Sequence, residues 1–183
     1  MSNRMKMILI LTLFACISGG VLSLVYLFSS PLIEANMLEE RNRSIFEVVP
    51  GVKTYEEKMQ DDLAYFLCKD ESGSVIGIAL PVQGNGYQGV IKLMVGLTPS
   101  LDRITGMAVL EQVETPGLGG RISEKSFQEQ FNNISTHPAV EYVKNQEPDK
   151  ENQIKAVTGA TISSRSVVAI INKNIQKLSS VIQ

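Results

Sequence analysis

Histidine and cysteine are scarce in this 183-residue chain, which contains one histidine and two cysteines. With His137 as the single histidine, a histidine-rich metal site is excluded, and its position before Pro138 indicates a loop residue. A disulfide is not expected either, because Cys16 lies in a long apolar run and Cys68 lies far outside it. Cys68 follows the residues AYFL, so we expect it to be buried and unreactive.

Charge is absent from residues 7–28, MILILTLFACISGGVLSLVYLF. As a helix rising about 1.5 Å per residue, this apolar run spans roughly 33 Å, close to the bilayer's hydrocarbon thickness of about 30 Å. A cleaved signal peptide has a shorter apolar core, of about 7 to 15 residues. A lipoprotein-type cut before Cys16 would leave many apolar residues on the mature chain. We therefore expect an uncleaved transmembrane helix surrounded by membrane lipid.

The charges on either side of the apolar run predict its orientation. Arg4 and Lys6 precede it, whereas residues 29–40 contain three glutamates and no basic residue. This bias predicts a cytoplasmic N-terminus in the inner cell membrane, with the rest of the chain on the outer or periplasmic side. That outer part holds 15 of the 17 basic residues and all 19 acidic ones, a formal net charge of −4. So acidic a balance argues against nucleic acid as a partner.

Four segments are predicted: a cytoplasmic N-terminus (1–6), a transmembrane helix (7–28), a connecting helix (29–50) and a globular domain (51–183). The pair Ser30–Pro31 is typical of a helix start, and Pro50–Gly51 is expected to end that helix near Val48.

Within the globular domain, runs rich in Val, Ile and Leu alternate with turn signals, which predicts an antiparallel meander. The expected strands are 64–68, 75–82, 89–97 and 104–113, followed by shorter ones at 139–143 and 154–157. Helices are expected at 123–131, with Phe127 and Phe131 on one face, and at 164–178. The fold class is α+β, one sheet with flanking helices.

The first glycine-rich stretch, Gly84 to Gly89 (GNGYQG), fits the G-x-G-x-x-G dinucleotide pattern. That fingerprint leads into a helix, whereas the residues that follow here, VIKLMV, predict a strand. We therefore interpret the glycines as a bend between strands or a close backbone approach. Tyr87, between them, either stacks on a partner or covers the sheet.

The second glycine-rich stretch, Glu114 to Gly120 (ETPGLGG), follows a predicted strand. Pro116–Gly117 alone would form a turn. Leu118 between flexible glycines, preceded by Glu114 and Thr115, also offers the exposed apolar surface and polar groups that a flat, amphipathic ligand requires.

A third stretch, Val157 to Arg165 (VTGATISSR), leads from a strand into the final helix. Free N–H groups of the first helical turn, expected near residues 162–165, and the positive end of the helix dipole favour a phosphate there. Alternatively, Ser163 only caps the helix. Hydroxyl groups, one positive charge and two small residues are available to a phosphate: Thr158, Thr161, Ser163, Ser164, Arg165, Gly159 and Ala160.

Together, the motifs at 86–91 (GYQGVI), 114–119 (ETPGLG) and 158–161 (TGAT) resemble those of the FMN-binding domain family. The resemblance extends over essentially the whole chain. With its single predicted span, the chain is most similar to the G subunits of Rnf-type complexes, which are ion-translocating ferredoxin:NAD oxidoreductases. The C subunits of sodium-pumping NADH:quinone reductases are near relatives.

The resemblance implies a membrane-anchored electron-transfer subunit that carries FMN covalently, through a phosphoester bond to Thr161 made by a separate flavin transferase. The complex would pass electrons between ferredoxin and NAD and translocate sodium ions or protons. The chain alone would have no turnover and no catalytic residue of its own. The implied flavin contacts are Glu114, Thr115, Gly117 and Leu118 around the ring, and Thr158, Gly159, Ala160, Ser163 and Ser164 beside Thr161.

One position departs from the family's pattern. An aspartate usually stands three residues before the first Ser or Thr of the motif, where this chain has Lys155. A hypothesis of another class is that the chain is a non-catalytic, membrane-anchored assembly or sensory module. Its third stretch would then serve only as a helix cap.

Overall fold

The computed structural model describes residues 2–61 and 63–182. The chain forms two compact units, Met1–Glu40 and Arg41–Gln183. The first helix, α1 (Asn3–Val48), begins in the first unit and ends in the second.

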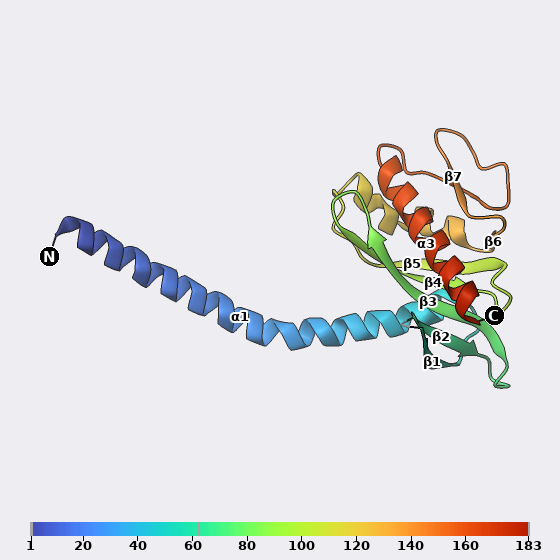
Figure 1. Cartoon of the computed structure of the whole chain (residues 1–183), viewed down its shortest axis with the longest axis horizontal. Helices are drawn as coiled ribbons and strands as arrows, with labels where there is room; N and C mark the ends of the chain where they lie inside the picture. Colours follow the sequence, from blue (N-terminus) through green and yellow to red (C-terminus); the bar gives the residue numbers. More distant parts are fainter. Residues whose placement is uncertain (1, 62, 183) are drawn as a thin grey trace. The chain divides into compact units, whose positions relative to one another are not determined.

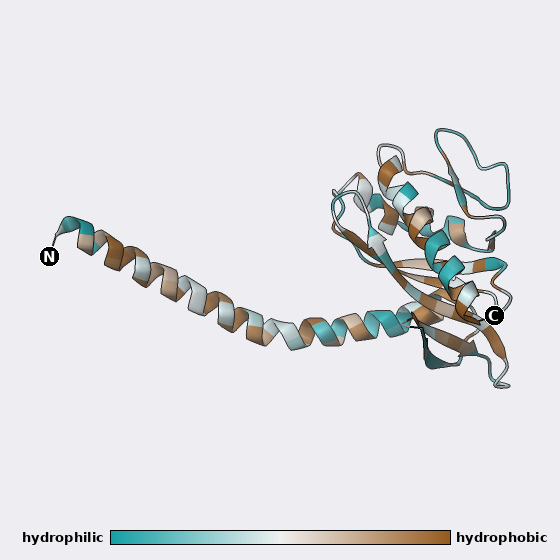
Figure 2. Cartoon of the chain, viewed as in Figure 1, coloured by the Kyte–Doolittle hydropathy of each residue, from teal (hydrophilic) through white to brown (hydrophobic). Residues whose placement is uncertain are grey.

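Helix α1 is continuous through Pro31, so the predicted helix start at Ser30–Pro31 is wrong. A proline removes one backbone hydrogen bond and strains the preceding turn, but it does not have to end a long helix. The side chains of residues 31–40 are exposed, and those of Ser29 and Ser30 are half-buried. By length and composition α1 can cross a membrane, and hydrophobic residues dominate its N-terminal part in Figure 2.

The second unit contains a six-stranded antiparallel meander in the order β1 to β6 (Figure 1). The strands are β1 (Thr54–Gln60), β2 (Leu63–Lys69), β3 (Val75–Asn85), β4 (Val90–Leu97), β5 (Arg103–Glu111) and β6 (Ile134–Ser135). The prediction of the meander and of its four central strands is confirmed. The short edge strand β6 and the edge strand β1 were not expected from the sequence, and none of the side chains of β1 is buried.

The remaining elements are short, apart from the last helix. They are η1 (Gly119–Ser123), α2 (Lys125–Gln128), η2 (Glu129–Phe131), the parallel pair β7 (Glu141–Val143) and β8 (Gln153–Lys155), and α3 (Thr161–Ile182). The single helix expected over 123–131 is therefore two short pieces, α2 and η2, and η1 precedes them. These pieces cover the part of the β5 edge that β6 does not pair with. There the Gln128 side chain accepts a hydrogen bond from the Val109 amide. Phe127 and Phe131 lie side by side, with ring centroids 5.6 Å apart, and both are buried.

The sheet has an apolar core on each face. Helix α3 packs on one face, where Val167, Ile171 and Leu178 join the larger cluster. On the other face the C-terminal turns of α1 contribute Ile45 and Val48 to a smaller cluster, which also contains Cys68. Cys68 is fully buried, as expected, and burial raises the pKa of its thiol. The two clusters hold the sheet rigidly beneath the loops described next.

Candidate functional site

The first glycine-rich stretch is the tight hairpin turn between β3 and β4. The Gly86 amide donates to the Gly89 carbonyl at 2.7 Å, and β4 follows directly. This confirms a bend between strands and excludes the strand-to-helix geometry of a dinucleotide site. A side chain at Gly86 would collide with Oε1 of Glu114, and one at Gly89 with the side chain of Val113. The hairpin turn therefore lies against the second loop.

The second loop contains the predicted Pro–Gly turn. The Thr115 carbonyl accepts from the amides of Leu118 at 3.1 Å and Gly120 at 3.0 Å, and Gly117 has φ = +75°. A left-handed φ at that place is what a type II turn needs from glycine. Leu118 is 49% exposed, although its Cδ2 would lie 3.4 Å from a Cβ placed on Gly159. The second loop therefore borders the third and presents an apolar side chain there.

The third stretch begins α3 at Thr161, three residues earlier than predicted. Two hydrogen bonds explain the early start, since the Ser164 amide donates to the Ala160 carbonyl and the Ser164 hydroxyl donates to the same carbonyl, both at 3.1 Å. That hydroxyl also accepts from the Val157 amide at 3.0 Å, and Ser164 is fully buried. The free N–H groups of the first turn are therefore those of residues 161–163, not 162–165.

A single carboxylate connects the three stretches. Oε1 of Glu114 accepts from the amides of Tyr87 at 2.7 Å and Gln88 at 3.0 Å, both in the hairpin turn. Oε2 accepts from the Ser163 hydroxyl at 2.5 Å. Glu114 and Ser163 are only 5% and 3% exposed. Ser163 therefore directs its hydroxyl to Glu114, and not to the N-terminal amides of its own helix as a cap would.

The same contacts keep Glu114 ionised. Burial acts to raise the pKa of this carboxyl, but the hydrogen bonds from Ser163 and from the amides of Gln88 and Tyr87 outweigh it. The pKa consequently lies below its usual range. At neutral pH a buried negative charge lies beside the first turn of α3, where the helix dipole stabilises it.

Two of the four hydroxyl groups between residues 158 and 165 remain available. In the described part of the chain, no hydrogen bond involves the hydroxyl of Thr158, which is exposed, or of Thr161, which is half-buried. Successive helical residues are about 100° apart. With Ser163 and Ser164 turned inward, Thr161 lies on the outward side near Arg165.

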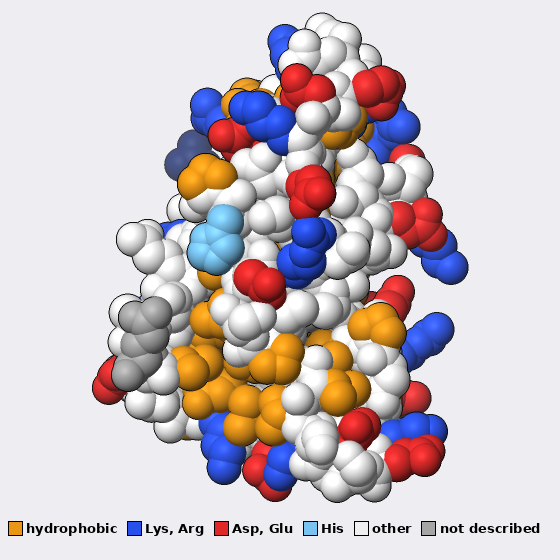
Figure 3. Space-filling view, turned by 90° about the vertical axis from the view of Figure 1, so that its right-hand side faces the viewer, with side chains coloured by type: hydrophobic (Ala, Val, Ile, Leu, Met, Phe, Trp, Pro, Cys, Tyr) orange, Lys and Arg blue, Asp and Glu red, His pale blue; other side chains and the backbone are white. Residues whose placement is uncertain are grey.

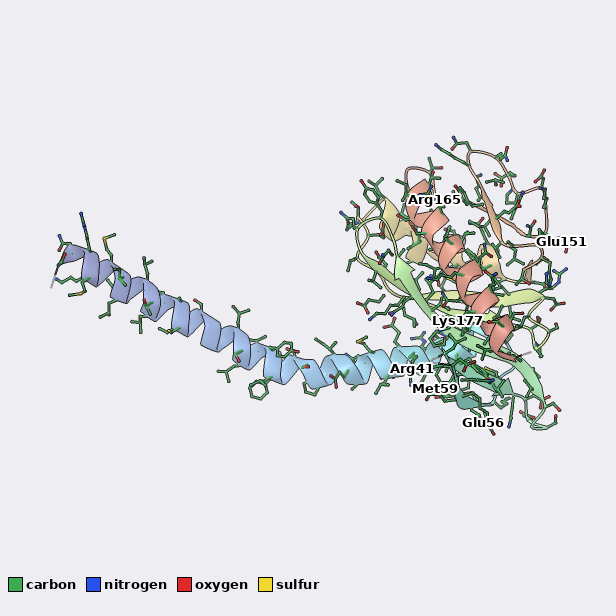
Figure 4. All side chains as sticks on the ribbon, viewed as in Figure 1. Arg41, Glu56, Met59, Glu151, Arg165 and Lys177 are labelled. Atoms are coloured by element: carbon green, nitrogen blue, oxygen red, sulfur yellow. The ribbon has the colours of Figure 1, made fainter. Side chains whose placement is uncertain are left out.

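These residues fit the phosphate end of FMN. Thr161 offers a free hydroxyl at a helix N-terminus, and the free N–H groups of residues 161–163 and the helix dipole favour an anion beside it. Arg165, exposed at the same end of α3 (Figure 4), adds a positive charge. Leu118, which borders Gly159, provides an apolar surface next to these groups.

Lys155 lies on β8 and is engaged within the protein. Its Nζ forms an ion pair with Glu147. Its backbone is held by Gln130, whose Oε1 accepts from the Lys155 amide at 2.7 Å and whose Nε2 donates to the Lys155 carbonyl at 3.3 Å.

His137 lies elsewhere, in an exposed loop as predicted. It borders an open groove of about 1040 Å³, which is lined by Pro99, Leu101, Pro138, Lys173 and Ile175 among others and by none of the predicted site residues. Figure 3 shows this face, on which apolar side chains gather below the pale blue histidine. Tyr87, in contrast, is 65% exposed on the hairpin turn and so does not cover the sheet.

Residues 86–176 match the FMN-binding domain family, and this match covers the motifs at 86–91, 114–119 and 158–161. The site therefore belongs to an FMN-binding domain, which confirms the family resemblance of the three motifs.

Two relatives match nearly the whole chain. It is 28% identical over 182 residues to the G subunit of the ion-translocating oxidoreductase complex of Methanosarcina acetivorans, covering 95% of this chain and 94% of that protein. It is 27% identical over 168 residues to the G subunit of the proton-translocating ferredoxin:NAD(+) oxidoreductase complex of Clostridium ljungdahlii, covering 92% and 88%.

The fold is shared with a solved structure, the C subunit of the Na(+)-translocating NADH-quinone reductase from Parabacteroides distasonis. The TM-score is 0.57 at 19% sequence identity, and the superposition covers 74% of this chain and 78% of that one.

Proposed function

We propose that this chain is a membrane-anchored electron-transfer subunit of an Rnf-type complex and that it carries FMN covalently on Thr161. The family match and the relatives from Rnf-type complexes support the class of protein. One observation carries the attachment site. Thr161 is the first residue of α3, and no hydrogen bond in the described part of the chain uses its hydroxyl.

The first turn of α3 suits a phosphodiester on Thr161. Such a linkage leaves one negative charge, which the free N–H groups of residues 161–163 and the helix dipole would stabilise. Leu118 would pack on the flavin ring, with Gly117 and the half-buried Thr115 beside it. When bound, FMN supplies the redox chemistry, and the protein supplies its position and its electrostatic surroundings.

The same proposal gives the chain its place in the cell. Residues 7–28 would cross the inner membrane in contact with lipid, with the N-terminus in the cytoplasm and the FMN-binding domain outside. Other membrane subunits of the complex would be its permanent partners. The whole assembly would couple electron transfer between ferredoxin and NAD to the translocation of sodium ions or protons.

Maturation requires a flavin transferase as an additional partner. The Lys155–Glu147 ion pair would face this enzyme close to the attachment site, at a position where the family usually has an acid. Glu147, eight positions before Lys155, supplies a carboxylate there.

A pair of variants tests the attachment site in protein purified from the native host. Thr161→Ala should contain no flavin after denaturation and removal of free flavin, because the acceptor oxygen is gone. Thr158→Ala is the matched control and should keep the yellow colour, since that exposed side chain makes no described hydrogen bond. Colour retained in Thr161→Ala would contradict the assignment, and a colourless wild type would favour the assembly or sensory module.

A further inference from the structure

Glu114 is surrounded by protein donors, which leaves it little capacity to bind a ligand. Its two carboxylate oxygens accept three hydrogen bonds, and the side chain is only 5% exposed. The backbone closes on it from two sides. A Cβ at Gly119 would lie 2.5 Å from Oε2, and one at Gly86 would collide with Oε1.

We propose that Glu114 is a positioning residue that fixes the orientation of Thr161 and does not itself contact the flavin. The inference rests on the proposed function, because it concerns how the acceptor hydroxyl is presented. Oε1 holds the hairpin turn through the amides of Tyr87 and Gln88. Oε2 holds Ser163, which lies two residues after Thr161 in the first turn of α3. One buried group thereby fixes a helix end relative to a hairpin.

The angle between successive residues of a helix explains how the bond between Glu114 and Ser163 orients Thr161. Anchoring Ser163 inward leaves Thr161 about 200° away around the helix axis, on the outward side. Without this anchor, the described side-chain hydrogen bonds of the first turn would be only those of Ser164 with the loop before it. Helix ends fray readily when such contacts are lost. The acceptor hydroxyl would then sample several orientations.

The carboxylate also brings the second loop into place. Glu114 is followed directly by Thr115, whose carbonyl closes the turn that presents Leu118. The backbone amide of Glu114 donates to Oε1 of Gln112 at 2.6 Å, which fixes the start of the second loop. The apolar surface for the ring and the hydroxyl for the phosphate are therefore held to the same residue. Pre-organisation of this kind lowers the entropy lost when reacting groups are brought together.

Ser163→Ala is the sharpest test, because it removes the hydrogen bond to Oε2 and leaves both bonds to Oε1. The full-length protein, folded and flavin-free in detergent, would be incubated with FAD and a flavin transferase active on the wild type. We expect the initial rate of flavin attachment per folded molecule to fall roughly 10- to 100-fold. Ser163→Thr, which retains the hydroxyl, should recover most of the rate. Ser180→Ala, exposed near the other end of α3, should react like the wild type.

Hydrogen exchange on the flavin-free protein provides a second readout. In Ser163→Ala the Ser164 amide should exchange faster, whereas the amides of Tyr87 and Gln88 should keep their protection. In Glu114→Leu all three should exchange faster, because every bond to the carboxylate is lost.

Two outcomes separate this inference from the proposed function. If Ser163→Ala is loaded at the wild-type rate, Glu114 is only a structural residue and the inference is wrong while the proposed function stands. A wild type that takes up no covalent flavin contradicts the proposed function and, with it, the positioning role. Unchanged exchange of Ser164 in Ser163→Ala would also overturn the inference, because the anchor would then have no effect on the first turn.

Discussion

The hydroxyl of Thr105, on β5, donates a 2.6 Å hydrogen bond to the backbone carbonyl of Val48, the last residue of α1. The last carbonyls of a helix have no partners within the helix, so this bond satisfies one of them. Two glycines opposite each other on β4 and β5, Gly96 and Gly106, allow the helix end to approach. The end of α1 is therefore built into the core of the FMN-binding domain.

Gly96→Ala should destabilise the domain, because the added Cβ would collide with the Val48 carbonyl oxygen and the Thr105 hydroxyl. Forcing extra atoms into a packed site costs about 1–3 kcal/mol, occasionally more. The buried thiol of Cys68 lies in the same apolar cluster as Val48. Its reaction with a thiol reagent therefore reports on opening of the domain. We expect faster modification of Cys68 by a thiol reagent, measured on a Cys16→Ser background.

Gly20→Ala is the matched control for this experiment. A Cβ at Gly20 meets no atom within 4 Å, so the reactivity of Cys68 should not change. Equal reactivity in Gly96→Ala and Gly20→Ala would show that the close approach of Val48 to the sheet does not matter for stability.

The central strands were predictable because β2 to β5 combine apolar runs with Gly, Pro and Ser turns. Strand β1 was not, because all of its side chains are exposed or half-exposed and leave no apolar pattern. The turn at Gly117 follows from local sequence as well. The start of α3 at Thr161 does not, because it depends on the hydrogen bonds of Ser164. The contacts of Glu114 do not, because they join residues up to 49 positions apart, and no local spacing indicates them.

Acid should weaken the domain partly through Glu114. Its pKa is lowered in the folded state, so its contribution to the free energy of unfolding is fully present above the ordinary value of 4.5. The contribution is lost as the pH falls through the lower, folded-state value. We predict a decrease in stability below about pH 4.5 and a smaller decrease in Glu114→Gln, measured by urea unfolding at several pH values.

The wild type must be compared with Glu114→Gln, because Asp70 and Asp102 also have lowered pKa values. Hydrogen bonds from nearby serines lower them. They contribute to the pH dependence of both proteins alike. Identical pH profiles for the wild type and Glu114→Gln would mean that the carboxylate is not held ionised by its partners.

The predicted topology can be tested by introducing one cysteine at a time, on a Cys16→Ser background, and labelling intact cells with a membrane-impermeant maleimide. Ser180 is exposed on α3. Ser180→Cys should therefore be labelled as soon as the reagent can reach the outer surface of the inner membrane. Ser2→Cys, on the other side of the apolar run, should be labelled only after the membrane is broken. Cys68 is buried and should stay unlabelled in both. The reverse pattern would overturn the assigned orientation.

The most direct measurement is peptide mass spectrometry on protein from the native host, where the proposed transferase would act. Trypsin should cut after Lys155 and Arg165 and release residues 156–165 as one peptide. We predict that this peptide is heavier by FMN less one water, with the added mass located on Thr161 by fragmentation. Recovery of only the unmodified peptide, or of the added mass on Thr158, would contradict the covalent attachment proposed here.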